Sequence, residues 1–117
     1  MKLWIDDIRD APDESWVEVR KVQPAIAMIA NFAMEEISLD HDIENRPDDE
    51  TFLPVAYFIA LRYHGLQEMS DFQTGFGPNK KAVPTITIHS VNPVGAKEMQ
   101  DIMADYGIKS TYKPYSK

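Results

Sequence analysis

The chain has 117 residues, a formal net charge of −7 and no cysteine. We therefore expect one domain, residues 1–117, without a disulfide framework or a thiolate metal site, and with no non-specific binding to duplex nucleic acid, which needs a basic surface. No apolar run approaches the roughly 20 residues of a membrane span and no secretory signal opens the chain, so we expect a cytoplasmic protein that does not enter membranes.

The first part of the chain predicts three strands and one helix. Residues 2–5 form a short apolar run that ends in two acids, which is typical of a buried strand. A loop rich in turn-forming residues follows, and "WVEVR", residues 16–20, alternates apolar and polar side chains like a second strand. Pro24 suits the first turn of a helix. Residues 35–40 then predict a third strand.

The middle of the chain predicts a deeply buried helix and a long loop. The segment "FLPVAYFIALRYH", residues 52–64, is apolar nearly all round, and Thr51 or Asp49 could cap it. Residues 65–83 show no clear period, and we expect a loop there. Its Lys80 and the lysine that follows could close over an anionic ligand, or the loop could be a plain connection.

The last part predicts a strand, a helix and a short strand. Residues 83–90, "VPTITIHS", are rich in β-branched side chains. Residues 92–107 have apolar side chains at helical spacing, with Gly107 placed to end the helix. A final strand is expected at about residues 109–112.

Strands that alternate with helices predict an α/β domain with a mostly parallel sheet covered on both faces. Ligands of such sheets bind beyond the carboxyl ends of the strands. Polar side chains that could carry chemistry follow three of the apolar runs and should meet at this edge: Asp6, Asp7, Asp40, His41, Asp42, His89 and Ser90.

Four carboxylates gathered at one edge would repel each other unless a cation neutralises them. Mg²⁺ prefers oxygen ligands and often also binds phosphate oxygens, so the pattern favours phosphoryl chemistry. A carboxylate could then act as nucleophile or base, and a histidine as a proton donor. Each of these residues could instead merely end a strand or cap a helix, and the residues leave Asp40 and Asp42 as alternatives for the nucleophile.

The motifs resemble the receiver domain of response regulators, a doubly wound, flavodoxin-like three-layer fold with a five-stranded parallel sheet. The resemblance lies in the acidic pair after the first strand, in "ISLD", in "ITIHS" and in "YKPY". It implies that Asp6, Asp7 and Asp40 hold Mg²⁺. It also implies that Asp40 is the nucleophile, and that Ser90 and Lys113 bind the phosphoryl group.

The chain departs from ordinary receivers in ways that resemble a divergent group, the cyclic-phosphate-processing receiver domains. Only about ten residues separate the first two predicted strands, and the chain ends at "KPYSK", so we expect the first and last receiver helices to be absent. The motifs "LDHD" and "HSVNPVG" add His41, Asp42, His89 and Asn92. The resemblance implies a small phosphorylated ligand, either a cyclic nucleotide or an RNA end.

The sequence and the resemblance leave three hypotheses for the function. The first is a Mg²⁺-dependent phosphoesterase with His41 or His89 as general acid, Asp42 as a further metal ligand, and Arg9 and Asn92 beside the phosphate. The second is a non-catalytic receiver-like module that binds a protein or nucleotide partner. The third is a degenerate fold kept as an interaction protein, for instance one encoded by a phage.

Overall fold

The computed structural model describes residues 1–43, 51–72 and 83–114. The strands and helices of these residues follow one another in this order: β1 (Lys2–Ile5), β2 (Trp16–Val19), α1 (Val22–Asn31), β3 (Glu36–Leu39), α2 (Leu53–Phe72), β4 (Thr85–Ile88), α3 (Pro93–Asp105) and β5 (Thr111–Tyr112). Each predicted strand and helix is present, and all except α2 lie within a few residues of their expected bounds.

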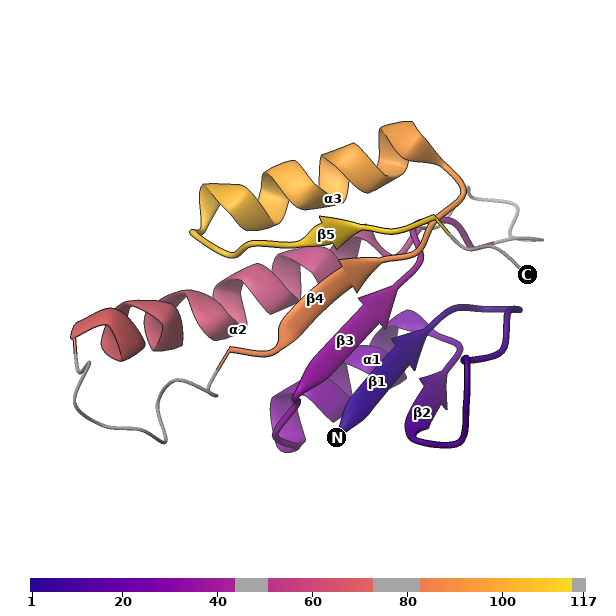
Figure 1. Ribbon diagram of the computed structural model, residues 1–117, viewed down its shortest axis with the longest axis horizontal. Coiled ribbons are helices and arrows are strands. Elements are labelled where there is room, and N and C mark those ends of the chain that lie inside the picture. Colours follow the sequence, from indigo (N-terminus) through magenta and orange to yellow (C-terminus); the bar gives the residue numbers. More distant parts are fainter. Residues whose placement is uncertain (44–50, 73–82, 115–117) are drawn as a thin grey trace.

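The strands form one parallel sheet with the order β2-β1-β3-β4-β5 (Figure 1). This is the strand order of the flavodoxin-like doubly wound fold, whose order reverses between β1 and β3. The predicted receiver-like fold class is therefore confirmed. As predicted, the connection from β1 to β2 carries no helix.

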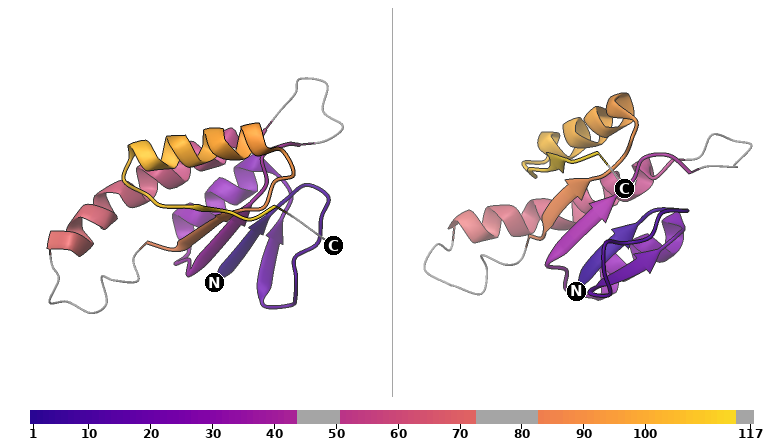
Figure 2. Two further views of the ribbon diagram at one scale, coloured as in Figure 1. Left: turned by 45° about the horizontal axis from the view of Figure 1, so that its top comes forward. Right: turned by 45° about the vertical axis from the view of Figure 1, so that its right-hand side comes forward.

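The helices lie on one face of the sheet, which we call the helix face (Figure 2). The connections through α1, α2 and α3 all step in the same direction along the sheet, so right-handed crossovers place the three helices together. The connection from β1 to β2 steps the other way and crosses the opposite face without a helix. For the described residues, the expectation that helices cover both faces of the sheet is therefore wrong. The alternation of strands and helices along the chain does not reveal in which direction each connection moves along the sheet.

Successive residues of each strand point to opposite faces of the sheet. The side chains on the helix face are apolar and pack with α1, α2 and α3 into the core; from the three central strands they are Leu3, Ile5, Ile37, Leu39, Ile86 and Ile88. The opposite side, which we call the second face, carries more polar side chains; from β1 to β4 they are Lys2, Trp4, Trp16, Glu18, Glu36, Ser38, Thr85 and Thr87. This division decides which predicted site residues can meet.

Helix α2 is longer than the sequence indicated, since it continues through Phe72. The prediction that residues 65–72 belong to a loop is therefore wrong. One glycine costs a helix about 1 kcal/mol, which is too little to end a helix that is already formed and is followed by good helix formers. Residues 73–82 of the predicted loop, which include Lys80, lie outside the described residues, as does Asp49.

The predicted signals at the other helix ends are present. The Thr51 hydroxyl accepts a hydrogen bond from the Leu53 N–H at the start of α2. Gly107 follows α3 with a φ of 77°, a conformation that glycine adopts readily. None of the described helices is both long enough and apolar enough to span a membrane.

Candidate functional site

The backbone ladder of the sheet places four predicted site residues in a row just past the strands. The Asp40 N–H donates to the Ile5 carbonyl at 2.9 Å, and the His89 N–H donates to the Leu39 carbonyl at 3.0 Å. Asp6 and Lys113 continue the ladder in the same way at the ends of β1 and β5. The row crosses the point between β1 and β3 where the strand order reverses, which is where ligands of this fold bind.

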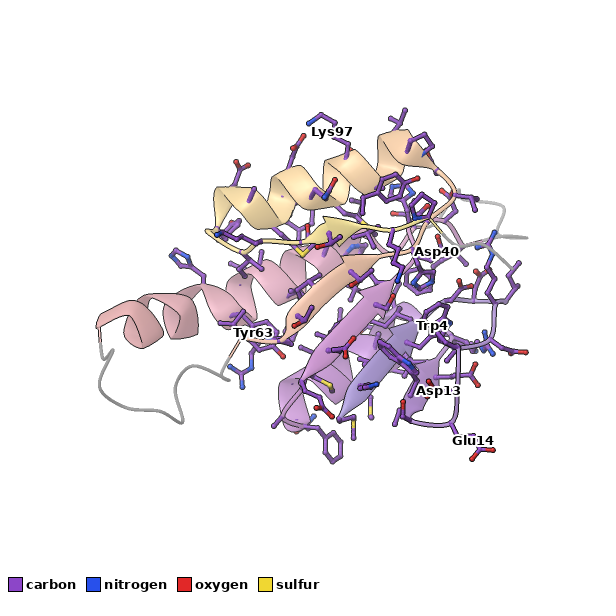
Figure 3. All side chains as sticks on the ribbon, in the orientation of Figure 1. Trp4, Asp13, Glu14, Asp40, Tyr63 and Lys97 are labelled. Atoms are coloured by element: carbon purple, nitrogen blue, oxygen red, sulfur yellow. The ribbon has the colours of Figure 1, made fainter. Side chains whose placement is uncertain are left out.

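Asp6, Asp7 and Asp40 form an acidic cluster at this point. One carboxylate oxygen of each residue lies within 4.8 Å of the others. Asp6 is fully buried and Asp40 is 2% exposed. Three carboxylates at this spacing fit a hard divalent cation such as Mg²⁺, which binds oxygen ligands and keeps several waters. Figure 3 labels Asp40 at the carboxyl ends of the strands.

The loop after β1 is folded around Asp6. Its Oδ1 atom accepts hydrogen bonds from the backbone N–H groups of Ile8 and Arg9, at 3.0 and 2.9 Å. The Arg9 carbonyl accepts from Trp4 Nε1 at 2.9 Å and from Arg20 Nη1 at 2.7 Å. These bonds fix the start of the loop on the sheet and aim the Arg9 side chain across the acidic cluster.

Arg9 lies between two of the carboxylates. Its Nη1 atom is 3.1 Å from Oδ2 of Asp40 and 3.7 Å from Oδ2 of Asp6. The guanidinium is therefore a cation already held at the cluster. Since arginine also binds phosphate well, it could pass from the carboxylates to an anionic ligand when a metal ion binds.

His89 is buried at the edge of the cluster, with 3% of its surface exposed. Its Nε2 atom lies 2.9 Å from Oδ2 of Asp6, and its Nδ1 atom lies 2.8 Å from Oγ of Ser38. An ionised carboxylate can only accept, so Nε2 donates to Asp6, and Nδ1 forms the second hydrogen bond of the ring with the Ser38 hydroxyl. The ring also stacks on Trp4, with the centroids 3.8 Å apart.

The pKa values of Asp40 and Asp6 are shifted in opposite directions. Burial raises the pKa of Asp40 above its ordinary value of 3.8, and the Asp6 carboxylate raises it further. Hydrogen bonding by the His41 N–H and the charges of His89 and Arg9 oppose this rise without cancelling it. Burial also raises the pKa of Asp6, but hydrogen bonds from His89 and from two backbone N–H groups outweigh it, so this pKa is lowered.

His41 and Asp42 join a second group of residues around the start of α3. The Nδ1 atom of His41 lies 2.8 Å from Oδ1 of Asp42, and the ring packs against Gly95. The Asn92 side chain caps α3 by accepting from the Gly95 N–H at 3.0 Å, and its amide nitrogen lies 3.4 Å from Asp42. The structure therefore brings Asp42 to α3 and not into the cluster of three acids.

Ser90 and Lys113 complete the predicted set. Ser90 is buried, and its hydroxyl accepts from the Asn92 N–H at 3.0 Å. Lys113 is exposed, and it lines a cavity on the second face together with His89.

The structure adds three residues that sequence reasoning did not assign to the site, namely Ser38, Trp4 and Arg20. Ser38 and Trp4 each lie two residues before a predicted metal ligand, so strand alternation places them on the same face as Asp40 and Asp6. This signal was available in the sequence. Arg20 gave no comparable signal, because its hydrogen bond to the Arg9 carbonyl joins two irregular segments.

A flavodoxin-like sheet with buried acids at the reversal of strand order defines a receiver-like domain. The family model of the cyclic-phosphate processing receiver domain matches residues 1–105, and the chain belongs to this family. The predicted family is confirmed, and membership supports a phosphoryl-related regulatory role. No curated protein and no solved structure matches the chain.

Proposed function

We propose that the protein is a Mg²⁺-dependent phosphoesterase that opens cyclic phosphates of nucleotides or RNA ends. The observation that carries this proposal is the cluster of Asp6, Asp7 and Asp40, whose oxygens lie within 4.8 Å of one another beside the Arg9 guanidinium. Carboxylates for a hard cation and a guanidinium for phosphate oxygens are the parts that phosphoryl chemistry needs. The family model supports the same class of substrate.

Asp6, Asp7 and Asp40 would hold the ion, which when bound neutralises phosphate oxygens and lowers the pKa of water. Asp40 is the candidate nucleophile or base, and its Oδ1 atom is held by the His41 N–H at 2.8 Å. Arg9 is placed to take phosphate oxygens from the other side. Ring opening adds water across one P–O bond and leaves a phosphomonoester and a free hydroxyl.

The leaving oxygen needs a proton, and the two predicted histidines differ in their access to the cluster. The His89 Nε2–H already donates to Asp6, whereas the His41 side chain faces Asp42, Gly95 and Glu98. We therefore favour His89 as proton donor over His41. Lys113 adds a cation at the end of β5, and Ser90 and Asn92 remain phosphate-binding candidates.

The test is hydrolysis of 2′,3′-cyclic nucleotides and cyclic dinucleotides, followed by ³¹P NMR. We expect ring opening that requires Mg²⁺ and falls about a hundredfold or more in Asp40→Asn and Asp6→Asn. Asp101→Asn is the matched control, because Asp101 is exposed on α3 and pairs with Lys97. Equal rates of hydrolysis in Asp40→Asn and in the unmodified protein, or no turnover with Mg²⁺, would refute the proposed phosphoesterase activity.

A non-catalytic binding module is the second candidate function, and the contacts of the Asp40 carboxylate favour it. One carboxylate oxygen is held by the His41 N–H and the other by Arg9, so ligand binding must rearrange these contacts. Such a rearrangement could alter the surface presented to a protein partner. Calorimetric titration with Mg²⁺ and beryllofluoride separates the two candidates, because the module predicts binding of both without turnover.

A further inference from the structure

A cavity of about 450 Å³ lies on the second face of the sheet. Trp4, Ser38, Thr87 and His89 line its floor, and Trp16 and Lys113 line it from the edge strands. Its size falls within the roughly 300–1,000 Å³ of small-molecule sites. The described helices all lie on the other face, so they do not fill it.

The cavity adjoins the acidic cluster through His89. Trp4 and Ser38 each stand two residues before a cluster acid on the same strand, a separation of roughly 7 Å. His89 belongs to both places, because it lines the cavity and donates to Asp6. A ligand with its phosphate at the cluster would therefore extend the rest of its structure over these side chains.

The chemical groups that line the cavity differ from the carboxyl ends of the strands to their amino ends. His89 and Lys113 lie at the carboxyl ends of the strands, and Thr87 contributes a hydroxyl in the middle. Glu36 lies at the amino end, where its carboxylate can accept hydrogen bonds. An anionic group at one end, a planar apolar body and N–H donors at the other end would match this order.

Aromatic side chains dominate the apolar part. The Trp16 ring meets the Trp4 ring edge to face, with centroids 5.9 Å apart, and remains half-buried. Trp4 is itself covered by His89. Indole rings are good platforms for stacking bases, and such stacking tolerates every base because each has a π face.

From this geometry we infer that the cavity holds the base of a nucleotide whose phosphate lies at Asp6, Asp7 and Asp40. This inference rests on the proposed function for the position of the phosphate and deepens it by assigning a site for the base. The base binds between Trp16 and the floor of the cavity. Cyclic phosphates without a base would then be poor ligands.

The test compares AMP with ribose 5-phosphate, which has the same sugar and phosphate but no base. In calorimetric titrations with Mg²⁺ present, we expect AMP to bind at least about tenfold more tightly. The chain contains two tryptophans, and both line the cavity. Both indole N–H signals in NMR spectra should therefore shift with AMP and much less with ribose 5-phosphate.

Two variants locate the base. Trp16→Leu removes the stacking surface, and Thr87→Ile fills the cavity with a β-branched residue that suits a strand. Each should remove the preference for AMP while the affinity for ribose 5-phosphate and Mg²⁺ is kept, which also shows that the variant is folded. Tyr57→Leu, which changes an exposed aromatic residue on α2, is the control that should keep the preference.

The outcomes separate this inference from the proposed function. Equal affinity for AMP and ribose 5-phosphate, or a preference that survives both cavity variants, overturns the inference and leaves the metal cluster intact. If Mg²⁺ does not bind while adenosine alone still shifts both indole signals, the phosphoesterase proposal fails and the cavity keeps its base-binding role. If neither Mg²⁺ nor adenosine binds, both are overturned.

Discussion

The Nε2 atom of His89 lies 2.9 Å from Oδ2 of Asp6, although 83 positions separate the two residues in sequence. This bond joins the end of β4 to the end of β1 across β3. Because both residues are buried, the bond holds one carboxylate of the acidic cluster in place before any ion arrives. The cluster is therefore built on the sheet rather than on a loose loop.

Removing this histidine should destabilise the fold. His89→Ala deletes a buried ring and leaves Asp6 and the Ser38 hydroxyl without their partner, at a cost of about 3 kcal/mol in the free energy of unfolding. Urea denaturation measures this cost. His64→Ala is the control, since His64 is exposed on α2, and it should cost less than about 1 kcal/mol. Similar losses in the two variants would contradict the role given to His89.

Magnesium should stabilise the native protein through the three acids. At a concentration one hundred times Kd, binding to the folded state alone adds about 2.7 kcal/mol to the free energy of unfolding. A thermal melt with and without Mg²⁺ should show a rise in Tm that disappears in Asp40→Asn. Asp42→Asn should keep the rise, because Asp42 lies against His41 and Asn92. Loss of the rise in Asp42→Asn would place that residue among the ligands.

Without metal, the two central acids should respond to substitution with opposite signs. The raised pKa of Asp40 means that its ionised form costs stability at pH values above that pKa. Asp40→Asn should therefore be more stable than the unmodified protein at pH 7 in a chelator, and this advantage should shrink as the pH falls through the pKa of Asp40, above 3.8.

The pKa of Asp6 is lowered, so its ionised form contributes stability at pH values above 3.8 that is lost as the pH falls through the folded pKa. Asp6→Asn should accordingly destabilise the protein at pH 7 and have less effect in acid. Chemical denaturation from pH 3 to 7 measures both curves. If both substitutions changed the free energy of unfolding at pH 7 with the same sign, the opposite pKa shifts of Asp40 and Asp6 would be refuted.

Gly95 should be intolerant of a side chain although it lies in a helix. A Cβ atom there would lie 2.5 Å from Cγ of the His41 ring. Alanine favours helices by up to about 1 kcal/mol, but this overlap should cost more, so we expect Gly95→Ala to lose about 2 kcal/mol. In a His41→Ala background the same change should become neutral or stabilising. A loss that persists in that background would show that the ring is not the cause.

Much of the fold could be predicted from local patterns. Short apolar runs marked the strands, and the positions of Pro24 and Gly107 agreed with the ends of helices. The length of α2 could not be predicted, because its polar second half has no period and continues a helix whose first half is held by burial. The face of each helix also depends on strand order, which no local pattern contains.

The acidic cluster could be predicted because parallel strands bring their carboxyl ends to one edge. To predict that His89 and His41 lie in different groups, one must also use the alternation of side chains between the two faces of the sheet. The His89 side chain contacts Ser38 and Trp4 on the second face, whereas the His41 ring packs against Gly95 of α3. The contact between Arg9 and Asp40 joins a loop to a strand end, and only the folded path of that loop reveals it.

The shared cation is tested most directly by a crystal soaked in Mn²⁺, which replaces Mg²⁺ and scatters anomalously. We expect one anomalous peak bounded by carboxylate oxygens of Asp6, Asp7 and Asp40, and no such peak in Asp40→Asn crystals. Crystals of the unmodified protein that show these three carboxylates at saturating Mn²⁺ with no peak between them would contradict this expectation.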